Sequence, residues 1–397
     1  MSDEKQKNQA RFAKFDLIVG TVVVLLIFVI GAVTYLDNPQ RQGAKVAYLY
    51  PLTSSASGET AIPNIWLASV ANPDDAQQLT NSRMGIFDFA VSNNGRYIAY
   101  SERDEELLLL DLYLLDLQTG DTSRLTNCAA EDSECYTPVF HPDNNTLAYM
   151  KKSLNRDLVT VSPGVSRIWL LDIAARTTQP LTTNTQMLGH SPVWSPDGNT
   201  IAFFSSDLNN PQILIYNFNP QIEDKRTVNA VPSQHGTTGT ISPNGQRLIF
   251  PDIVDRGGVI ETHLKIVDLS TDPVQFVDFT DKDGQFSDLS AQWHPDGQTV
   301  TVARKYNDDR WTLGHQLYNI DADTDDVTPL LVDSRFTHSF YTWNNTGTKL
   351  LLQRLALRDE QGNPERAARP AIWVLDSETG ELVKVSDFAY HPRWVLP

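Results

Sequence analysis

The sequence has few cysteines, few basic residues and few helical patterns, and each of these shortages argues against a class of protein. It has only two cysteines in 397 residues, which excludes a metal site or a small fold built on many cysteines. Its 32 lysines and arginines face 49 aspartates and glutamates, and the net charge of −17 disfavours binding to nucleic-acid phosphates. It also lacks long amphipathic helical patterns between its apolar runs, which disfavours a fold of alternating strands and helices.

Motifs that hold cofactors or catalytic nucleophiles are absent as well. There is no Walker A loop, no G-x-G-x-x-G and no C-x-x-C-H haem motif, so we expect no cofactor. There is no G-x-S-x-G nucleophile elbow, so a serine hydrolase is not expected. We therefore predict no catalytic residues, and a binding protein is favoured over an enzyme.

One sequence motif occurs six times along the chain at nearly constant spacing. Residues 191–207 read SPVWSPDGNTIAFFSSD, which is a strand, an Asp-Gly turn suited to a tight hairpin, and a second strand. Successive turns are 49, 54, 47, 52 and 50 residues apart. The turn positions are Gly95, Asn144, Gly198, Gly245, Gly297 and Gly347. A period near 50 residues, from about residue 46 to the end, indicates a repeat architecture.

Each repeat contains four short strands, which is the pattern of one blade of a β-propeller. Six turns suggest six blades, but the strand-like segments at the two ends of the repeat region together add a seventh blade. KVAYLYPL near residue 46 matches a second strand, and AYHPRWVLP at the C terminus matches a first strand. We expect residues 390–396 to pair with residues 46–50 and close the ring. The predicted fold class is all-β, a seven-bladed β-propeller (six-bladed as the alternative) preceded by one transmembrane helix.

The order IWLLD…LT…PVWSPDG resembles the TolB-like propeller repeats of bacterial extracytoplasmic proteins, over about residues 46–397. The resemblance implies the propeller fold and a role in protein contacts. TolB has an α/β domain before its propeller, and here a membrane span is expected in its place. An anchor followed by a propeller also occurs in serine peptidases of the prolyl-oligopeptidase class. We expect no such hydrolase here, because the nucleophile motif is missing and no residues remain for that domain.

The N-terminal region is expected to anchor the chain in a membrane. Residues 17–36 carry no charge over twenty positions, enough for a helix to span about 30 Å of hydrocarbon. A cleaved signal peptide is the alternative. Four basic residues precede the span and two follow it closely, so we expect the N terminus in the bacterial cytoplasm and the propeller in the periplasm. The predicted segments are a cytoplasmic tail (1–16), a single-pass signal-anchor helix (17–36), a linker (37–45) and the propeller (46–397).

The two cysteines, Cys128 and Cys135, have six residues between them in the polar stretch TNCAAEDSECYT. That spacing fits neither a zinc finger nor a thioredoxin-type motif. In an oxidising compartment we expect them to form a disulfide.

Three histidines precede first strands and are expected to surround one mouth of the central channel. They are His190, His235 and His338. Some TolB-like lyases that act on pectic oligosaccharides hold a metal with histidines in that region, so the resemblance makes these residues metal candidates. Their offsets from the aligned repeat positions differ, however, and we predict no metal.

The long loops between second and third strands lie on the same face, which we call the top face. Arg310 and Trp311 on one such loop, and Arg335 on a neighbouring connection, are the predicted partner-binding residues, with His190 and His338 at the mouth. The Asp-Gly turns lie on the opposite face, which is expected to be nearer the membrane. The predicted function is a protein-binding or assembly scaffold. The alternative is a carbohydrate-binding or metal-dependent, lyase-like propeller that uses the channel mouth.

Overall fold

The structure is a computed structural model of the chain. It describes residues 43–51, 61–154, 165–184, 187–205, 210–217, 228–280, 286–359, 361–365 and 369–396. The predicted cytoplasmic tail, the predicted transmembrane helix and most of the predicted linker lie outside these residues. Within the described part of the chain, no helix has the length and apolar character needed to cross a membrane.

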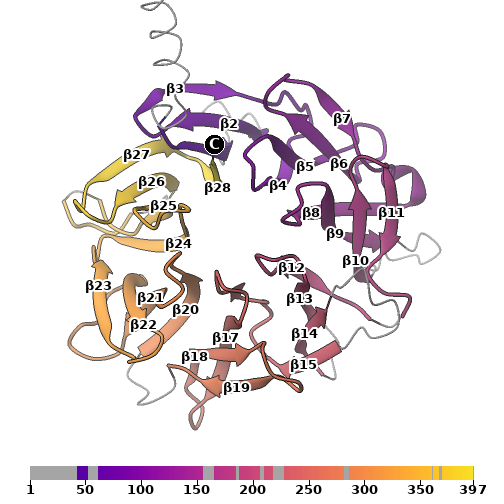
Figure 1. The fold of residues 1–397 in the computed structure, drawn as a ribbon. Coiled ribbons are helices and arrows are strands. Elements are labelled where there is room, and N and C mark those ends of the chain that lie inside the picture. Colours follow the sequence, from indigo (N-terminus) through magenta and orange to yellow (C-terminus); the bar gives the residue numbers. More distant parts are fainter. Residues whose placement is uncertain are drawn as a thin grey trace, which may run out of the picture. The chain divides into compact units, whose positions relative to one another are not determined.

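The unit from Lys45 to Pro397 consists of seven four-stranded antiparallel sheets, which we number as blades 1 to 7. Figure 1 shows the blades around a common centre, with the first-named strand of a blade nearest to it. Blade 1 comprises β28 (Tyr390–Val395), β1 (Lys45–Tyr50), β2 (Asn64–Ser69) and β3 (Asn72–Gln78). Blade 2 comprises β4 (Ile86–Val91), β5 (Tyr97–Arg103), β6 (Leu110–Asp116) and β7 (Thr122–Arg124). Blade 3 comprises β8 (Ser133–Phe140), β9 (Thr146–Ser153), β10 (Ser166–Asp172) and β11 (Thr177–Pro180).

The remaining four blades follow in chain order. Blade 4 comprises β12 (His190–Trp194), β13 (Thr200–Ser205), β14 (Gln212–Asn217) and β15 (Val228–Pro232). Blade 5 comprises β16 (Thr240–Ile241), β17 (Arg247–Asp255), β18 (Ile260–Asp268) and β19 (Gln275–Asp278). Blade 6 comprises β20 (Phe286–Trp293), β21 (Thr299–Tyr306), β22 (Gln316–Asp321) and β23 (Val327–Leu331). Blade 7 comprises β24 (Phe336–Trp343), β25 (Lys349–Ala356), β26 (Pro370–Asp376) and β27 (Leu382–Asp387).

The ring closes through blade 1, whose inner strand comes from the C-terminal end of the chain. β28 pairs antiparallel with β1, so that Lys45 lies opposite Val395 and Leu49 opposite Tyr390. This pairing removes the unpaired edge that β1 would otherwise present. It confirms the seven-bladed propeller and the predicted pairing of the two ends of the repeat region.

Aromatic residues at the ends of inner strands hold neighbouring blades together. Trp194 of blade 4 packs among apolar residues of blade 3, including Met150 and Leu170. Trp343 of blade 7 packs against blade 6, where its indole nitrogen donates to the Thr301 hydroxyl at 3.0 Å. The hydrophobic core therefore lies between the blades, because each sheet buries both of its faces against neighbours.

Two hairpin turns add a histidine contact across the blade boundary. The His141 ring of blade 3 meets Trp194 edge-on with centroids 4.7 Å apart, and its Nε2 donates to the Gly198 carbonyl at 3.0 Å. His294 of blade 6 repeats the same 3.0 Å bond with Gly347 of blade 7. Each of these histidines therefore links its own turn to the turn of the next blade.

Cys128 and Cys135 are joined by a disulfide with their Cα atoms 5.9 Å apart. The short 3-10 helix η1 (Ala129–Glu131) lies between them, and Cys135 lies within β8 rather than in the polar loop expected from the sequence. Both cysteines are buried in the core between blades 2 and 3. The buried Asp111 carboxylate accepts the backbone N–H groups of Cys128 and Ala129, which supplies the polar contacts that this short helix needs.

Candidate functional site

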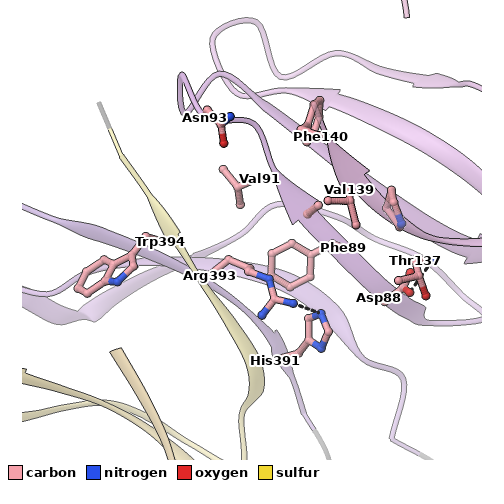
Figure 2. Close-up of a pocket in the computed structure, with 12 residues that line it drawn as sticks. Asp88, Phe89, Val91, Asn93, Thr137, Val139, Phe140, His391, Arg393 and Trp394 are labelled. Atoms are coloured by element: carbon pink, nitrogen blue, oxygen red, sulfur yellow. Dashed lines mark hydrogen bonds between the residues drawn. The ribbon is translucent and has the colours of Figure 1, made fainter. Parts of the chain in front are cut away.

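The inner strands β28, β4 and β8 line a cavity of about 310 Å³. Its polar side chains include Asp88, Thr137, His391 and Arg393, and Figure 2 shows His391 and Arg393 next to each other. The strands come from blades 1, 2 and 3, so the cavity exists only once the ring has closed.

The side chains of this cavity shift one another's pKa values. Arg393 donates from a terminal nitrogen to Nε2 of His391 at 3.1 Å, so the His391 ring accepts there and is neutral with its proton on Nδ1. Burial lowers the pKa of His391 to about 3, with Arg393 lowering it further. Burial also lowers the pKa of Arg393 to about 10, while the carboxylate of Asp88 acts in the opposite direction.

Asp88 joins blade 2 to blade 3. Its carboxylate accepts the backbone N–H of Thr137 at 2.8 Å and the hydroxyl of Ser101. Burial raises the pKa of Asp88, although these hydrogen bonds act to lower it. The cavity thus presents a guanidinium and a neutral imidazole, which suits carbonyl or carboxylate oxygens. Asp88, Thr137 and Arg393 were not predicted from the sequence to form a site, although Arg393 occupies the repeat position where Val193 stands in blade 4.

The structure separates the three histidines that were metal candidates. His190 begins β12, His235 lies between β15 and β16, and His338 lies inside β24. Within the described residues, no group of three or more His, Cys, Asp or Glu side chains is arranged to hold a metal. Burial lowers the pKa of His190 and of His235, and it lowers that of His338 to about 3.

The prediction that His338 binds a partner is not compatible with its position in the structure. His338 is 0% exposed and stands opposite Arg354 of β25, beside a bulge in β24. A fully buried side chain cannot touch a partner, so the prediction that His338 contacts one is wrong. His190 is partly exposed and contacts the Phe204 ring at 5.2 Å between centroids.

The structure brings Arg310, Trp311 and Arg335 onto neighbouring loops of blades 6 and 7. Trp311 is 54% exposed, and Lys305 lies over its ring at 5.1 Å. Arg310 lies over the Tyr306 ring at 3.5 Å, which holds its guanidinium in place beside that loop.

The two loops are held together by hydrogen bonds around Gln316. Its side chain donates to the Phe336 carbonyl at 3.0 Å and accepts the backbone N–H of Asp333 at 2.7 Å. The backbone N–H of His315 also donates to the Thr337 hydroxyl at 3.1 Å. Two more apolar residues of these loops are exposed, Leu313 at 45% and Val332 at 50%. We call Arg310, Trp311, Leu313, Val332 and Arg335 the upper patch.

Comparison with solved structures shows the same fold at low sequence identity. The β-propeller domain of the Trilobed protease from Pyrococcus furiosus matches with a TM-score of 0.59 and 12% identity over 87% of this chain and 93% of that one. That propeller is described as having an open velcro topology, whereas β28 and β1 pair here. An oligogalacturonate lyase in complex with manganese matches with a TM-score of 0.55 and 12% identity over 87% of this chain and 86% of that one.

Peptidases are also among the similar proteins, and this chain spans only part of them. A puromycin-hydrolyzing peptidase from Mycobacterium tuberculosis matches with a TM-score of 0.61 and 12% identity, over 89% of this chain and 53% of that one. The uncharacterized peptidase YuxL from Bacillus subtilis is 26% identical over 139 residues, which are 35% of this chain and 20% of that protein. These likenesses concern the propeller.

The family model for the TolB beta propeller domain, PD40, matches residues 67–347, which is more than half of the chain. The matched region runs from the outer half of blade 1 into the β24–β25 turn of blade 7 and therefore contains most of the ring. The chain belongs to the TolB β-propeller domain family.

Proposed function

We propose that the protein is a membrane-anchored, extracytoplasmic propeller that binds another protein through the upper patch and has no catalytic role of its own. The observation that carries this proposal is the exposure of Trp311, Leu313 and Val332 beside two arginines. Tryptophan and arginine are the residues most enriched where binding energy concentrates in protein interfaces. Exposed apolar side chains that gather on one rigid surface are typical of a docking site.

The rigidity of the surface supports the same proposal. Gln316 and His315 fasten the Trp311 loop to the start of β24, so the patch loses little conformational freedom when a partner docks. The membrane anchor and the periplasmic location remain part of the proposal, and they rest on the apolar residues 17–36 and their flanking charges.

Charge reversal in the upper patch tests this function. We expect the double variant Arg310→Glu/Arg335→Glu to lose capture of the partner from membranes, while its melting temperature stays close to that of the parent. The matched control is Arg96→Glu, which removes an exposed arginine paired with Asp116 beside the Gly95 turn on the opposite face.

A photo-crosslinking amino acid in place of Trp311 would identify the contact directly. A crosslinked partner from position 311, and none from position 96, is the expected result. Loss of capture by the Arg96 variant together with unchanged capture by the double variant would place the binding surface on the Asp-Gly turn face and contradict the proposal.

A further inference from the structure

Blade 7 contains a cavity that is rich in positive charge although the whole chain is acidic. Its volume is about 440 Å³, and five cationic side chains and three aspartates line it. The cationic residues are Arg335, Arg354, Arg358, Arg369 and Lys384. In a chain of net charge −17, such a local excess of positive charge attracts anions to this one place.

Arg354 is the buried residue of this cavity, and its hydrogen bonding is incomplete. It is 2% exposed, and it donates from a terminal nitrogen to Asp333 at 3.1 Å. Its Nε has no hydrogen-bond partner within the described part of the chain. The same Asp333 carboxylate also accepts two bonds from Arg335, at 3.0 and 2.9 Å, so one carboxylate serves two guanidinium groups.

The surroundings of Arg354 do not compensate for this missing partner. The residue opposite it is His338, which is 0% exposed and finds no hydrogen-bond partner for either ring nitrogen among the residues that the structure describes. A buried guanidinium with an unused donor is costly unless an anion completes its pairing. The cavity therefore has an excess of cationic side chains and a guanidinium whose pairing is incomplete among the described residues.

Aromatic rings form another part of the cavity wall. The Arg354 guanidinium lies over the Phe336 ring at 3.9 Å and the Trp373 ring at 5.2 Å, and Lys384 lies 5.5 Å from the Trp373 ring. The indole nitrogen of Trp373 is a second buried donor for which the described residues offer no partner. An arginine fork beside aromatic faces suits a carboxylate attached to a flat apolar body.

We propose that this cavity of blade 7 binds a small carboxylate ligand with a planar, apolar body, and that Arg354 is its principal contact. Arg369 and Lys384 contribute positive charge at the cavity. The ligand is bound by the propeller without a protein partner, although the cavity shares Arg335 with the upper patch.

Calorimetric titration of the full-length protein with benzoate tests the proposal, with benzamide as the uncharged probe of the same shape and inorganic phosphate as the compact anion. We expect benzoate to bind, and benzamide and phosphate to bind at least about tenfold more weakly, since only benzoate combines a carboxylate for Arg354 with a flat body for the aromatic rings. Equal binding of benzamide or phosphate, or no binding of benzoate, would overturn the proposal.

Substitutions of lining residues test whether benzoate binds in this cavity. Arg369→Gln and Lys384→Gln should each weaken benzoate binding several-fold, and Arg354→Gln should weaken it at least about tenfold. Arg96→Gln is the control, because Arg96 is an arginine on the opposite face. Since Arg354→Gln can disturb folding, the Arg369 and Lys384 variants decide the outcome, and unchanged affinity in both would refute the site.

Discussion

Single residues connect the blades at points where no backbone pairing exists between them. The His141 ring fills the space beside Gly198, so that a Cβ on that glycine would lie 2.1 Å from Nε2 of His141. Gly198 also has a φ of +73°, which favours glycine. Two separate requirements therefore apply to this residue, one from its own backbone and one from the neighbouring blade.

Comparison of two glycine variants separates these requirements. Gly297 has a φ of +74°, and no atom of the described residues lies within 4 Å of the position of a Cβ, so Gly297→Ala carries only the backbone cost of about 1–2 kcal/mol. We expect Gly198→Ala to lower the free energy of unfolding by more than this, because it also displaces His141. Urea unfolding of both variants measures the difference, and equal losses would show that the histidine contact contributes nothing.

At the scale of elements, the disulfide fixes the connection between blades 2 and 3. Closing so short a loop contributes about 2.5 kcal/mol in the chain-entropy model. We expect a reducing agent to lower the free energy of unfolding by about this amount and to leave the double variant Cys128→Ser/Cys135→Ser unaffected. Mass spectrometry of protein kept from reductants should find no free thiol, and two free thiols would contradict both the bond and the oxidising compartment.

The strand β28 is the element on which ring closure depends. Removal of residues 390–397 would leave β1 without its inner neighbour and would remove Trp394, whose indole nitrogen donates to the Thr342 carbonyl of blade 7 at 3.1 Å. We expect the shortened protein to aggregate or to melt at a much lower temperature. Scanning calorimetry of the two proteins provides the measurement, and equal melting temperatures would show that closure is not needed.

At the scale of the whole molecule, the propeller and the N-terminal region are separate units, divided between Ala44 and Lys45. We expect a variant that lacks residues 1–42 to leave the membrane fraction and to keep the melting temperature of the propeller, since its core lies within residues 45–397. Fractionation and calorimetry of both forms make the comparison. Equal membrane association of the shortened form would refute residues 17–36 as the anchor.

The number of blades could be predicted from the sequence because hairpin turns are local, and the closure of the ring because the two ends of the repeat region match different strands of one repeat. Hairpin turns such as that at Gly198 depend on a few adjacent residues, and the spacing of these turns repeats the blade. The matching of AYHPRWVLP to a first strand required only a comparison of repeats. The pairing of Cys128 with Cys135 could likewise be expected, since the chain holds no other cysteine.

Only the tertiary structure decided which side chains meet inside and between blades. Asp88 and Arg393 line one cavity because closure brings blade 1 beside blade 2, although the two residues are far apart in the sequence. His338, predicted to bind a partner, is buried opposite Arg354 of β25, beside a bulge in β24 that has counterparts in β4 and β20. Contacts of this kind arise from the packing of whole sheets, so a sequence read repeat by repeat contains the strands but not the environment of each side chain.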